Sequence, residues 1–160
     1  MNNCPTITVE INMHYDAWNW WDCVNNRRSY GIDWVKRCPK ELVPMIMGKT
    51  QKEARLALCP FLEQKYKQIN IENTRTTFQA GFDEKRHAIF EAMEKLTGKP
   101  IFQDNIICYL TTFQSYPYDT KIGALYLNAT GKFDNQVEIF LHELLHLQAH
   151  YYWEKNSEKL

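Results

Sequence analysis

The residues best suited to chemistry lie together near the end of the chain. Within Val137–His146, the residues His142, Glu143 and His146 form the pattern H-E-x-x-H. On a helix, residues four apart lie one turn apart on the same face, so both imidazoles can face one cation. Neutral imidazole is a good zinc ligand, and the carboxylate of Glu143 can reach a water molecule beside that cation. The motif therefore predicts a zinc site at His142 and His146 with Glu143 as the general base.

The surroundings of the motif are typical of an amphipathic helix. Apolar side chains cover more than half of its circumference, and His142, Glu143, His146 and His150 form the remaining polar stripe. A helix this apolar is expected to be mostly buried. Ionisable groups on a buried helix need water, a partner or a metal ion. A metal ion would satisfy this stripe, and the alternative is an ordinary amphipathic helix whose polar stripe faces solvent.

Over Val137–Tyr151 the sequence resembles the active-site helix of the zincin metallopeptidases. The metzincin extension is absent, because Leu147–His150 contains no glycine, so the resemblance is closest to the gluzincins. It implies a zinc-dependent peptidase acting on peptide or protein substrates. It also implies a third zinc ligand, which in gluzincins is a glutamate from a later helix.

The third ligand has several candidates. His150 rises about 12 Å from His142 on a continuous helix, too far for one ion to bind both comfortably. Glu154 has the same difficulty, and Glu158 would need the chain to turn at Asn156–Ser157. His14 and the acidic residues of the long central helix cannot be ranked by sequence. The chain ends 14 residues after His146, and its last residues could continue as a helix. A further hypothesis is that the sequence is C-terminally incomplete and that the third ligand is a glutamate from residues after Leu160.

Composition limits the class of protein. The chain has 160 residues, 44% of them hydrophobic, which predicts a single globular domain over residues 1–160. Its 19 basic and 19 acidic residues give zero net charge, so we expect no nucleic-acid or membrane partner. Five cysteines, an odd number, argue against a disulfide framework. With no signal peptide or membrane span in the sequence, we expect a cytoplasmic protein.

The first half of the chain predicts one strand and two helices. Residues 6–15 alternate between apolar and polar, as in a half-buried strand. Asp16 is expected to cap a helix over 17–25 that carries core tryptophans. Thr50–Glu53 has the spacing of a capping box that opens a helix, with a kink or split expected at Pro60.

The second half predicts a long helix, two strands and the motif helix. Apolar residues recur at helical spacing over 72–96, and His87 lies on a solvated face. Residues 106–113 and 122–128 are strand-like and are expected to pair antiparallel through a short turn. Asn135–Glu138 has capping-box spacing, so the motif helix is expected to begin at Asn135.

These elements predict an α+β fold, zincin-like and mostly helical, with a small mixed sheet that includes an antiparallel hairpin before the motif helix. By resemblance to zincins, residues 122–128 would be the edge strand that holds extended substrate. Three functions stay open: a zinc peptidase, an inactive zincin-like domain that binds metal or peptide, and a helical interaction domain without metal. Tyr126, Tyr151 and Tyr152 are candidates for stabilising an oxyanion, or for packing. The sequence indicates neither substrate preference nor oligomeric state.

Overall fold

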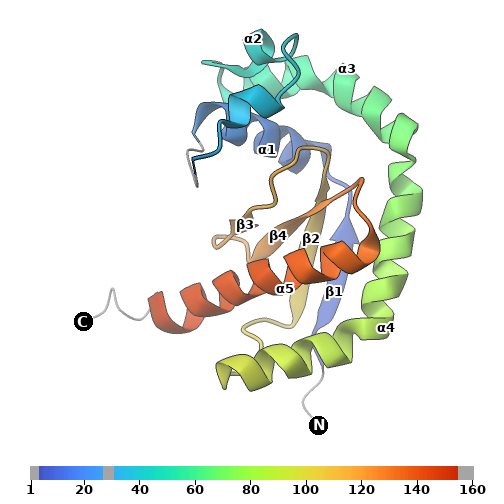
Figure 1. Ribbon diagram of the computed structural model, residues 1–160, viewed down its shortest axis with the longest axis vertical. Helices are drawn as coiled ribbons and strands as arrows, with labels where there is room; N and C mark the ends of the chain where they lie inside the picture. Colours follow the sequence, from blue (N-terminus) through green and yellow to red (C-terminus); the bar gives the residue numbers. More distant parts are fainter. Residues whose placement is uncertain (1–3, 27–30, 155–160) are drawn as a thin grey trace.

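A computed structural model describes residues 4–26 and 31–154. The fold is α+β and mostly helical, with one small mixed sheet of four strands (Figure 1). Among the described residues no helix is long and apolar enough to cross a membrane. In chain order the elements are β1 (Thr6–Glu10), α1 (Met13–Asn25), the 3₁₀ helix η1 (Trp34–Arg37), α2 (Val43–Ile46), α3 (Gln51–Ile69), α4 (Ile71–Thr97), β2 (Asn105–Thr111), β3 (Tyr118–Asp119), β4 (Ala124–Asn128), α5 (Phe133–Ala149) and the π-helical turn η2 (His150–Glu154).

The sheet has the strand order β1-β2-β4-β3, with β1, β2 and β4 parallel and β3 antiparallel to β4. The expected antiparallel pairing of residues 106–113 with 122–128 is therefore wrong. Residues 112–123 separate β2 from β4, and a connection of about a dozen residues is long enough for a parallel crossover. The antiparallel hairpin before α5 is formed by β3 and β4 instead. Residues 122–128 are also not an edge strand, because β3 lies outside β4.

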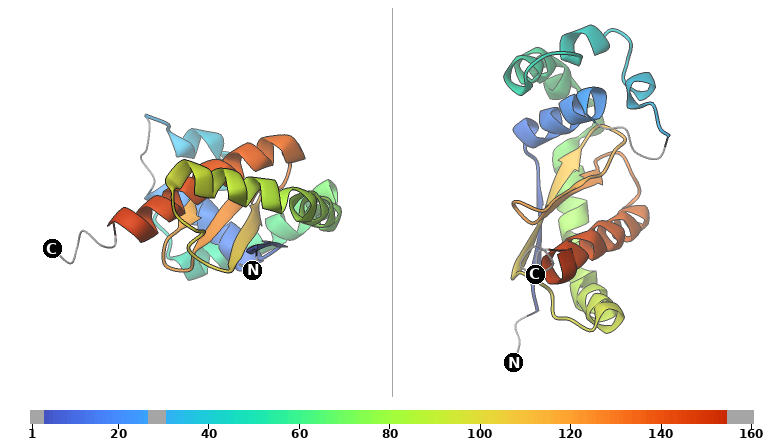
Figure 2. Two further views of the ribbon diagram at one scale, coloured as in Figure 1. Left: turned by 90° about the horizontal axis from the view of Figure 1, so that it is seen from below. Right: turned by 90° about the vertical axis from the view of Figure 1, so that its left-hand side faces the viewer.

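Side chains of the sheet alternate between two layers of helices. Cys108 and Leu110 of β2, with Leu125 and Leu127 of β4, belong to a buried cluster that includes residues of α4 and α5. Tyr109 and Tyr126 point to the opposite face, where Tyr15 and Trp18 of α1 pack against them. The right-hand view of Figure 2 shows α4 and α5 together on one side of the sheet. A second cluster joins α1, α2 and α3.

The N-terminal strand is shorter than predicted and the first helix begins earlier. Asn12 caps this helix, since its side-chain oxygen accepts the backbone N–H groups of His14 and Tyr15 at 3.0 and 3.4 Å. The prediction that Asp16 is the cap is wrong, because Asp16 lies inside α1 and is fully buried. Apolar and polar residues alternate through Met13, but the Asn12 cap ends the extended backbone after β1.

The helices of the central region agree more closely with the sequence. Thr50 and Glu53 form the predicted capping box of α3, and α4 lies within one residue of the predicted helix at each end. The predicted split at Pro60 does not occur, because α3 is continuous there. Pro60 removes one backbone donor, whereas Leu58 and Leu62 on either side are both fully buried and hold the helix against the core.

Two smaller predictions have different outcomes. All five cysteines are free thiols, in agreement with the expectation that the chain has no disulfide framework. The motif helix begins at Phe133 rather than Asn135, and Lys132 precedes it without a side-chain cap. The capping box at Asn135 is therefore wrong. Gln136 turns inward instead, where its side-chain oxygen accepts the backbone N–H of Asn128 at 2.8 Å.

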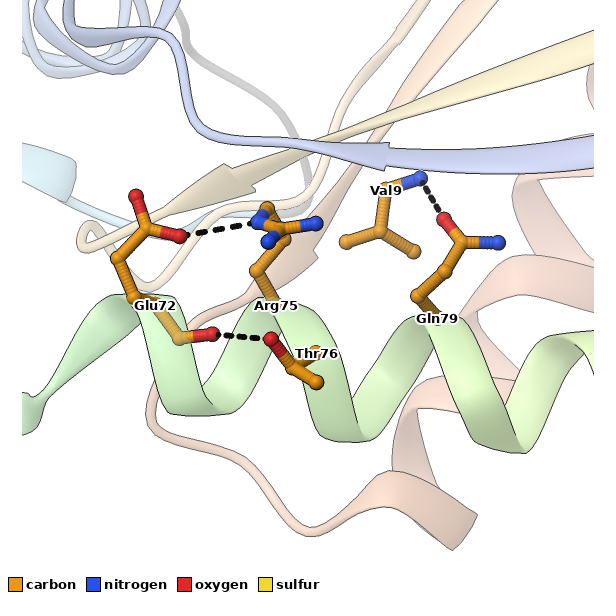
Figure 3. A network of polar contacts seen from close by, with 5 residues as sticks. All are labelled: Val9, Glu72, Arg75, Thr76 and Gln79. Atoms are coloured by element: carbon orange, nitrogen blue, oxygen red, sulfur yellow. Dashed lines mark hydrogen bonds and ion pairs between the residues drawn. The ribbon is translucent and has the colours of Figure 1, made fainter.

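The outer edge of β1 is covered by a side chain of α4. The amide of Gln79 accepts the backbone N–H of Val9 and donates to the carbonyl of Ile7, both at 2.8 Å (Figure 3 draws the first of these). The side-chain amide thus replaces the backbone partner that a further strand would supply. An uncovered edge is a template for pairing with another chain, so Gln79 protects this side of the sheet.

We expect Gln79→Leu to lower the free energy of unfolding by about 1–3 kcal/mol, because two half-buried backbone groups lose their partners. Urea unfolding measures this change. Glu72→Gln is the control on the same helix: it breaks the exposed 3.0 Å pair with Arg75 seen in Figure 3, and such pairs contribute about 0–1 kcal/mol. Equal losses in the two variants would contradict the role given to Gln79.

Candidate metal centre

The helix α5 is oriented by the side chains that it buries. Phe140 and Leu144 are fully buried in the cluster that the sheet shares with α4 and α5, and Leu147 is almost completely buried. His142 lies on the exposed side of the helix, and Glu143 and His146 are half-buried. The helical period therefore directs the motif residues away from the core and toward solvent. The polar stripe is not enclosed by apolar side chains.

The two histidines of the motif converge. Their Nε2 atoms lie 3.1 Å apart, and the ring centroids are 4.7 Å apart with an interplanar angle of 81°. Two nitrogens that each lie about 2.0–2.1 Å from one tetrahedral zinc ion are about 3.3 Å apart. The separation of His142 and His146 thus fits two ligands of one zinc ion. The same separation also suits a hydrogen bond in which one ring N–H is donated to the other ring.

The motif opens into a cleft of about 720 Å³. Cavities of about 300–1,000 Å³ are typical of ligand sites. Three parts of the chain form its walls: α5, the region of η1, and the segment between β2 and β3. The residues that line it are Ile32, Trp34, Gln114, Ser115, Tyr116, Pro117, Tyr118, His142, Glu143 and His146. Outside the motif, five of the seven lining residues are apolar or aromatic, so the polar motif faces a largely apolar wall.

Tyr118 brings the edge strand into direct contact with the motif. Its ring stacks on the imidazole of His146, with centroids 4.9 Å apart and an interplanar angle of 12°. Tyr118 belongs to β3, whose pairing with β4 places it beside α5. The stacked ring limits the orientations open to His146. The contact could not be predicted from the sequence, which indicates only a turn at residues 115–119.

The described residues bring no third ligand to the histidine pair. Within residues 4–26 and 31–154, no group of three His, Cys, Asp or Glu side chains is placed to hold a metal ion. His150 is paired with Glu154, with Nδ1 and Oε2 2.9 Å apart. The ring of His14 lies beside Arg55 of α3, and His87 is exposed as expected. Glu158 lies outside the described residues.

The tyrosines proposed as oxyanion partners do not line the cleft. Tyr126 is fully buried under α1, and Tyr151 and Tyr152 belong to η2. Tyr116 and Tyr118 occupy the cleft wall instead. Burial raises the pKa of Tyr116, although nearby Arg37 and a hydrogen bond with Asn128 act in the opposite direction. The phenol of Tyr116 therefore stays protonated at neutral pH and can donate a hydrogen bond.

A buried carboxylate lies beneath the cleft wall. Asp16 accepts hydrogen bonds from the hydroxyls of Thr111 and Thr112 at 2.8 Å, from the backbone N–H of Thr112 at 2.9 Å and from the hydroxyl of Tyr66 at 3.0 Å. Asn19, also fully buried, donates to Thr111 at 2.8 Å. We call Asp16, Asn19, Thr111 and Thr112 the Asp16 network. It joins α1 to the end of β2, where the chain leaves the sheet to form the cleft wall.

Asp16 makes the stability depend on pH. Burial raises its pKa above the ordinary value of 3.8, although the four hydrogen bonds oppose that shift. A carboxyl group whose pKa is higher in the folded than in the unfolded state contributes most to the free energy of unfolding below its unfolded-state pKa. That contribution is lost as pH rises toward the folded-state pKa. As pH rises above about 4, the ordinary pKa of an aspartate, we therefore expect the natural protein to lose stability relative to Asp16→Asn.

Urea unfolding at several pH values measures this difference. Asp104→Asn, at an exposed position, controls for the loss of one negative charge. If the free energies of unfolding of Asp16→Asn and the natural protein differ by the same amount at every pH, the raised pKa of Asp16 is contradicted.

Comparison of the chain with known protein families, curated proteins and solved structures found no match. The likeness to zincins therefore depends on the motif, on the resemblance of Val137–Tyr151 to a zincin helix and on the geometry described above. Membership of that family stays a prediction, whereas the α+β fold with a small mixed sheet is a property of the structure.

Proposed function

We propose that this protein is a zinc-dependent peptidase whose metal is held by His142 and His146. The observation that carries the proposal is the 3.1 Å separation of the two Nε2 atoms, at the mouth of a cleft that Glu143 also lines. The separation suits two ligands of a tetrahedral ion, and the exposure of His142 would leave an ion bound there accessible to substrate. An open coordination position distinguishes catalytic zinc sites from structural ones.

In the proposed reaction Glu143 is the general base. A bound zinc ion supplies a Lewis acid that makes water acidic enough to react near neutral pH and polarises the carbonyl of the scissile bond. Glu143 accepts a proton from the attacking water while the water oxygen bonds to the carbonyl carbon of the substrate. Glu143 then delivers that proton to the leaving nitrogen as the C–N bond breaks. No covalent link to the protein forms, and the carboxylate returns to its starting state.

The apolar lining of the cleft favours a peptide substrate that carries a bulky apolar side chain. Ile32, Trp34 and Pro117 provide apolar surface beside the motif. The outer edge of β3 has no neighbouring strand in the described sheet, so it can pair with an extended backbone. This role was expected for residues 122–128, and we propose Tyr118–Asp119 for it instead, because β3 lies outside β4.

A peptidase assay with and without chelator tests the proposal. Quenched fluorescent peptides carrying Phe or Leu are incubated with zinc-loaded protein, and cleavage is followed by fluorescence and mass spectrometry. We expect cleavage that stops when zinc is removed with a chelator and returns when zinc is added. Cleavage that continues without zinc would contradict the proposed mechanism.

The alternative is an inactive zincin-like domain that binds metal or peptide. It is favoured by one observation: within the described part of the chain, the motif histidines have no third protein ligand beside them. Such a domain would bind zinc at His142 and His146 and would bind peptides without cleaving them. A helical interaction domain would bind no zinc at all. Zinc analysis and the peptidase assay together separate the three functions.

A further inference from the structure

Asn19 of α1 reaches the wall of the cleft through the interior of the protein. Its side chain is fully buried, and its two amide N–H groups are both used. One donates to the hydroxyl of Thr111 and the other to the backbone carbonyl of Ser115, each at 2.8 Å. Ser115 is itself buried and lines the cleft. The amide therefore ties the helix α1 directly to the segment that forms the cleft wall.

Thr111, which accepts one of the Asn19 hydrogen bonds, makes a second link between α1 and this segment. Its hydroxyl donates to Asp16 at 2.8 Å and accepts the backbone N–H of Phe113 at 3.2 Å. The Asp16 network thus holds the backbone at Phe113, directly before the cleft wall, and at Ser115 within the wall. The next point is held by the sheet, where the backbone N–H of Tyr126 donates to the carbonyl of Pro117 at 3.0 Å.

Tyr118 follows directly on this segment and stacks on His146. Because Tyr118 is 38% exposed, burial alone does not fix its ring. Its place is set by the backbone that precedes it and by the two-residue strand β3. A displacement of the backbone at Ser115 would therefore move Tyr118 relative to the imidazole.

We propose that Asn19 and Thr111 are positioning residues, which fix the segment Phe113–Tyr118 and thereby set the ring of Tyr118 against His146. Buried hydrogen bonds of this kind are hard to rearrange, because a displaced partner loses its bond without gaining water. The inference concerns the arrangement of the cleft and holds whether or not the protein hydrolyses peptides. In the proposed peptidase, the same contact would orient one zinc ligand.

Nuclear magnetic resonance of the histidine rings tests this proposal. Protons over the face of an aromatic ring shift upfield, so Tyr118 should shift the ring protons of His146. Tyr118→Leu removes that shift and defines its size. In Asn19→Leu we expect most of the shift to be lost while the signals of His142 change less. Spectra are recorded at about pH 8, where an ordinary imidazole is neutral.

Asn25→Leu is the matched control on the same helix. Asn25 also forms side-chain hydrogen bonds, half-buried ones with the backbone carbonyls of Trp21 and Ile46 and an exposed one with the backbone N–H of Gly48, none of them to the cleft wall. We expect it to lower stability and leave the His146 signals unchanged. The same loss of shift in both variants would overturn the proposal, because the effect would then follow from general destabilisation. A folded Asn19→Leu variant with an unchanged His146 signal would also overturn it.

Thr111 supplies a second test with a conservative rescue. Thr111→Val lacks the hydroxyl and should lose the His146 shift, whereas Thr111→Ser keeps the hydroxyl and should retain it. The natural protein provides a measurement that needs no variant. The side-chain amide protons of Asn19 should exchange with solvent slowly, as buried and bonded protons do. Exchange as fast as that of an exposed amide would contradict the connection between α1 and the cleft.

Discussion

Replacing Glu143 by glutamine is expected to lower kcat/KM for peptide hydrolysis by about a hundredfold to ten-thousandfold, the usual contribution of a general base. Glutamine has nearly the same shape and cannot accept a proton at neutral pH. The histidines are unchanged in this variant, so zinc content should stay the same. Steady-state kinetics on the best peptide substrate, combined with elemental analysis, measure both quantities.

Glu138→Gln is the control for this experiment. Glu138 is exposed on the same helix and does not line the cleft, so its replacement should leave kcat/KM unchanged. Full activity in Glu143→Gln would remove Glu143 from the proposed role. Equal losses in the two variants would point to the charge of α5 rather than to proton transfer.

The second large effect is expected on stability, when a buried leucine that anchors the motif helix α5 to the core is shortened. Leu144 is fully buried, and Leu145, the next residue, is 38% exposed. Leu144→Ala should lower the free energy of unfolding by about 2–5 kcal/mol, because it leaves a cavity in the core beneath the motif. Leu145→Ala should cost less than about 1 kcal/mol, since little buried surface is lost.

Chemical denaturation of the two variants under identical conditions measures this contrast. Native domains are stable by about 5–15 kcal/mol, so Leu144→Ala would remove a large share. The same substitution at neighbouring positions isolates burial from helix propensity. Similar losses at the two positions would show that α5 does not pack on the core as described.

Local patterns predicted the parts of the fold that depend on neighbouring residues. Helical periodicity located α4 within one residue at each end, and the Thr50–Glu53 capping box marked the start of α3. The relative placement of the motif histidines could also be predicted, because residues four apart on one helix share a face. The convergence of His142 and His146 follows from that local rule.

The parts that depend on distant residues were missed. The parallel pairing of β2 with β4 depends on how residues 112–123 cross the sheet, and alternation within a strand does not encode its direction. Asp16 is a residue type that commonly caps helices, but Thr111, at the end of β2, and the following Thr112 bind it in the interior. Trp34 reaches the cleft from a region with no recognisable motif.

The zinc content of the purified protein tests the central claim most directly. Elemental analysis is made on the full chain after zinc loading and removal of free metal, for the natural protein and for His142→Ala, His146→Ala and His150→Ala. The account predicts about one zinc ion per chain, lost in the first two variants and kept in the third, since His150 pairs with Glu154 instead. A natural protein that binds no zinc, or one whose zinc survives both His142→Ala and His146→Ala, would contradict it.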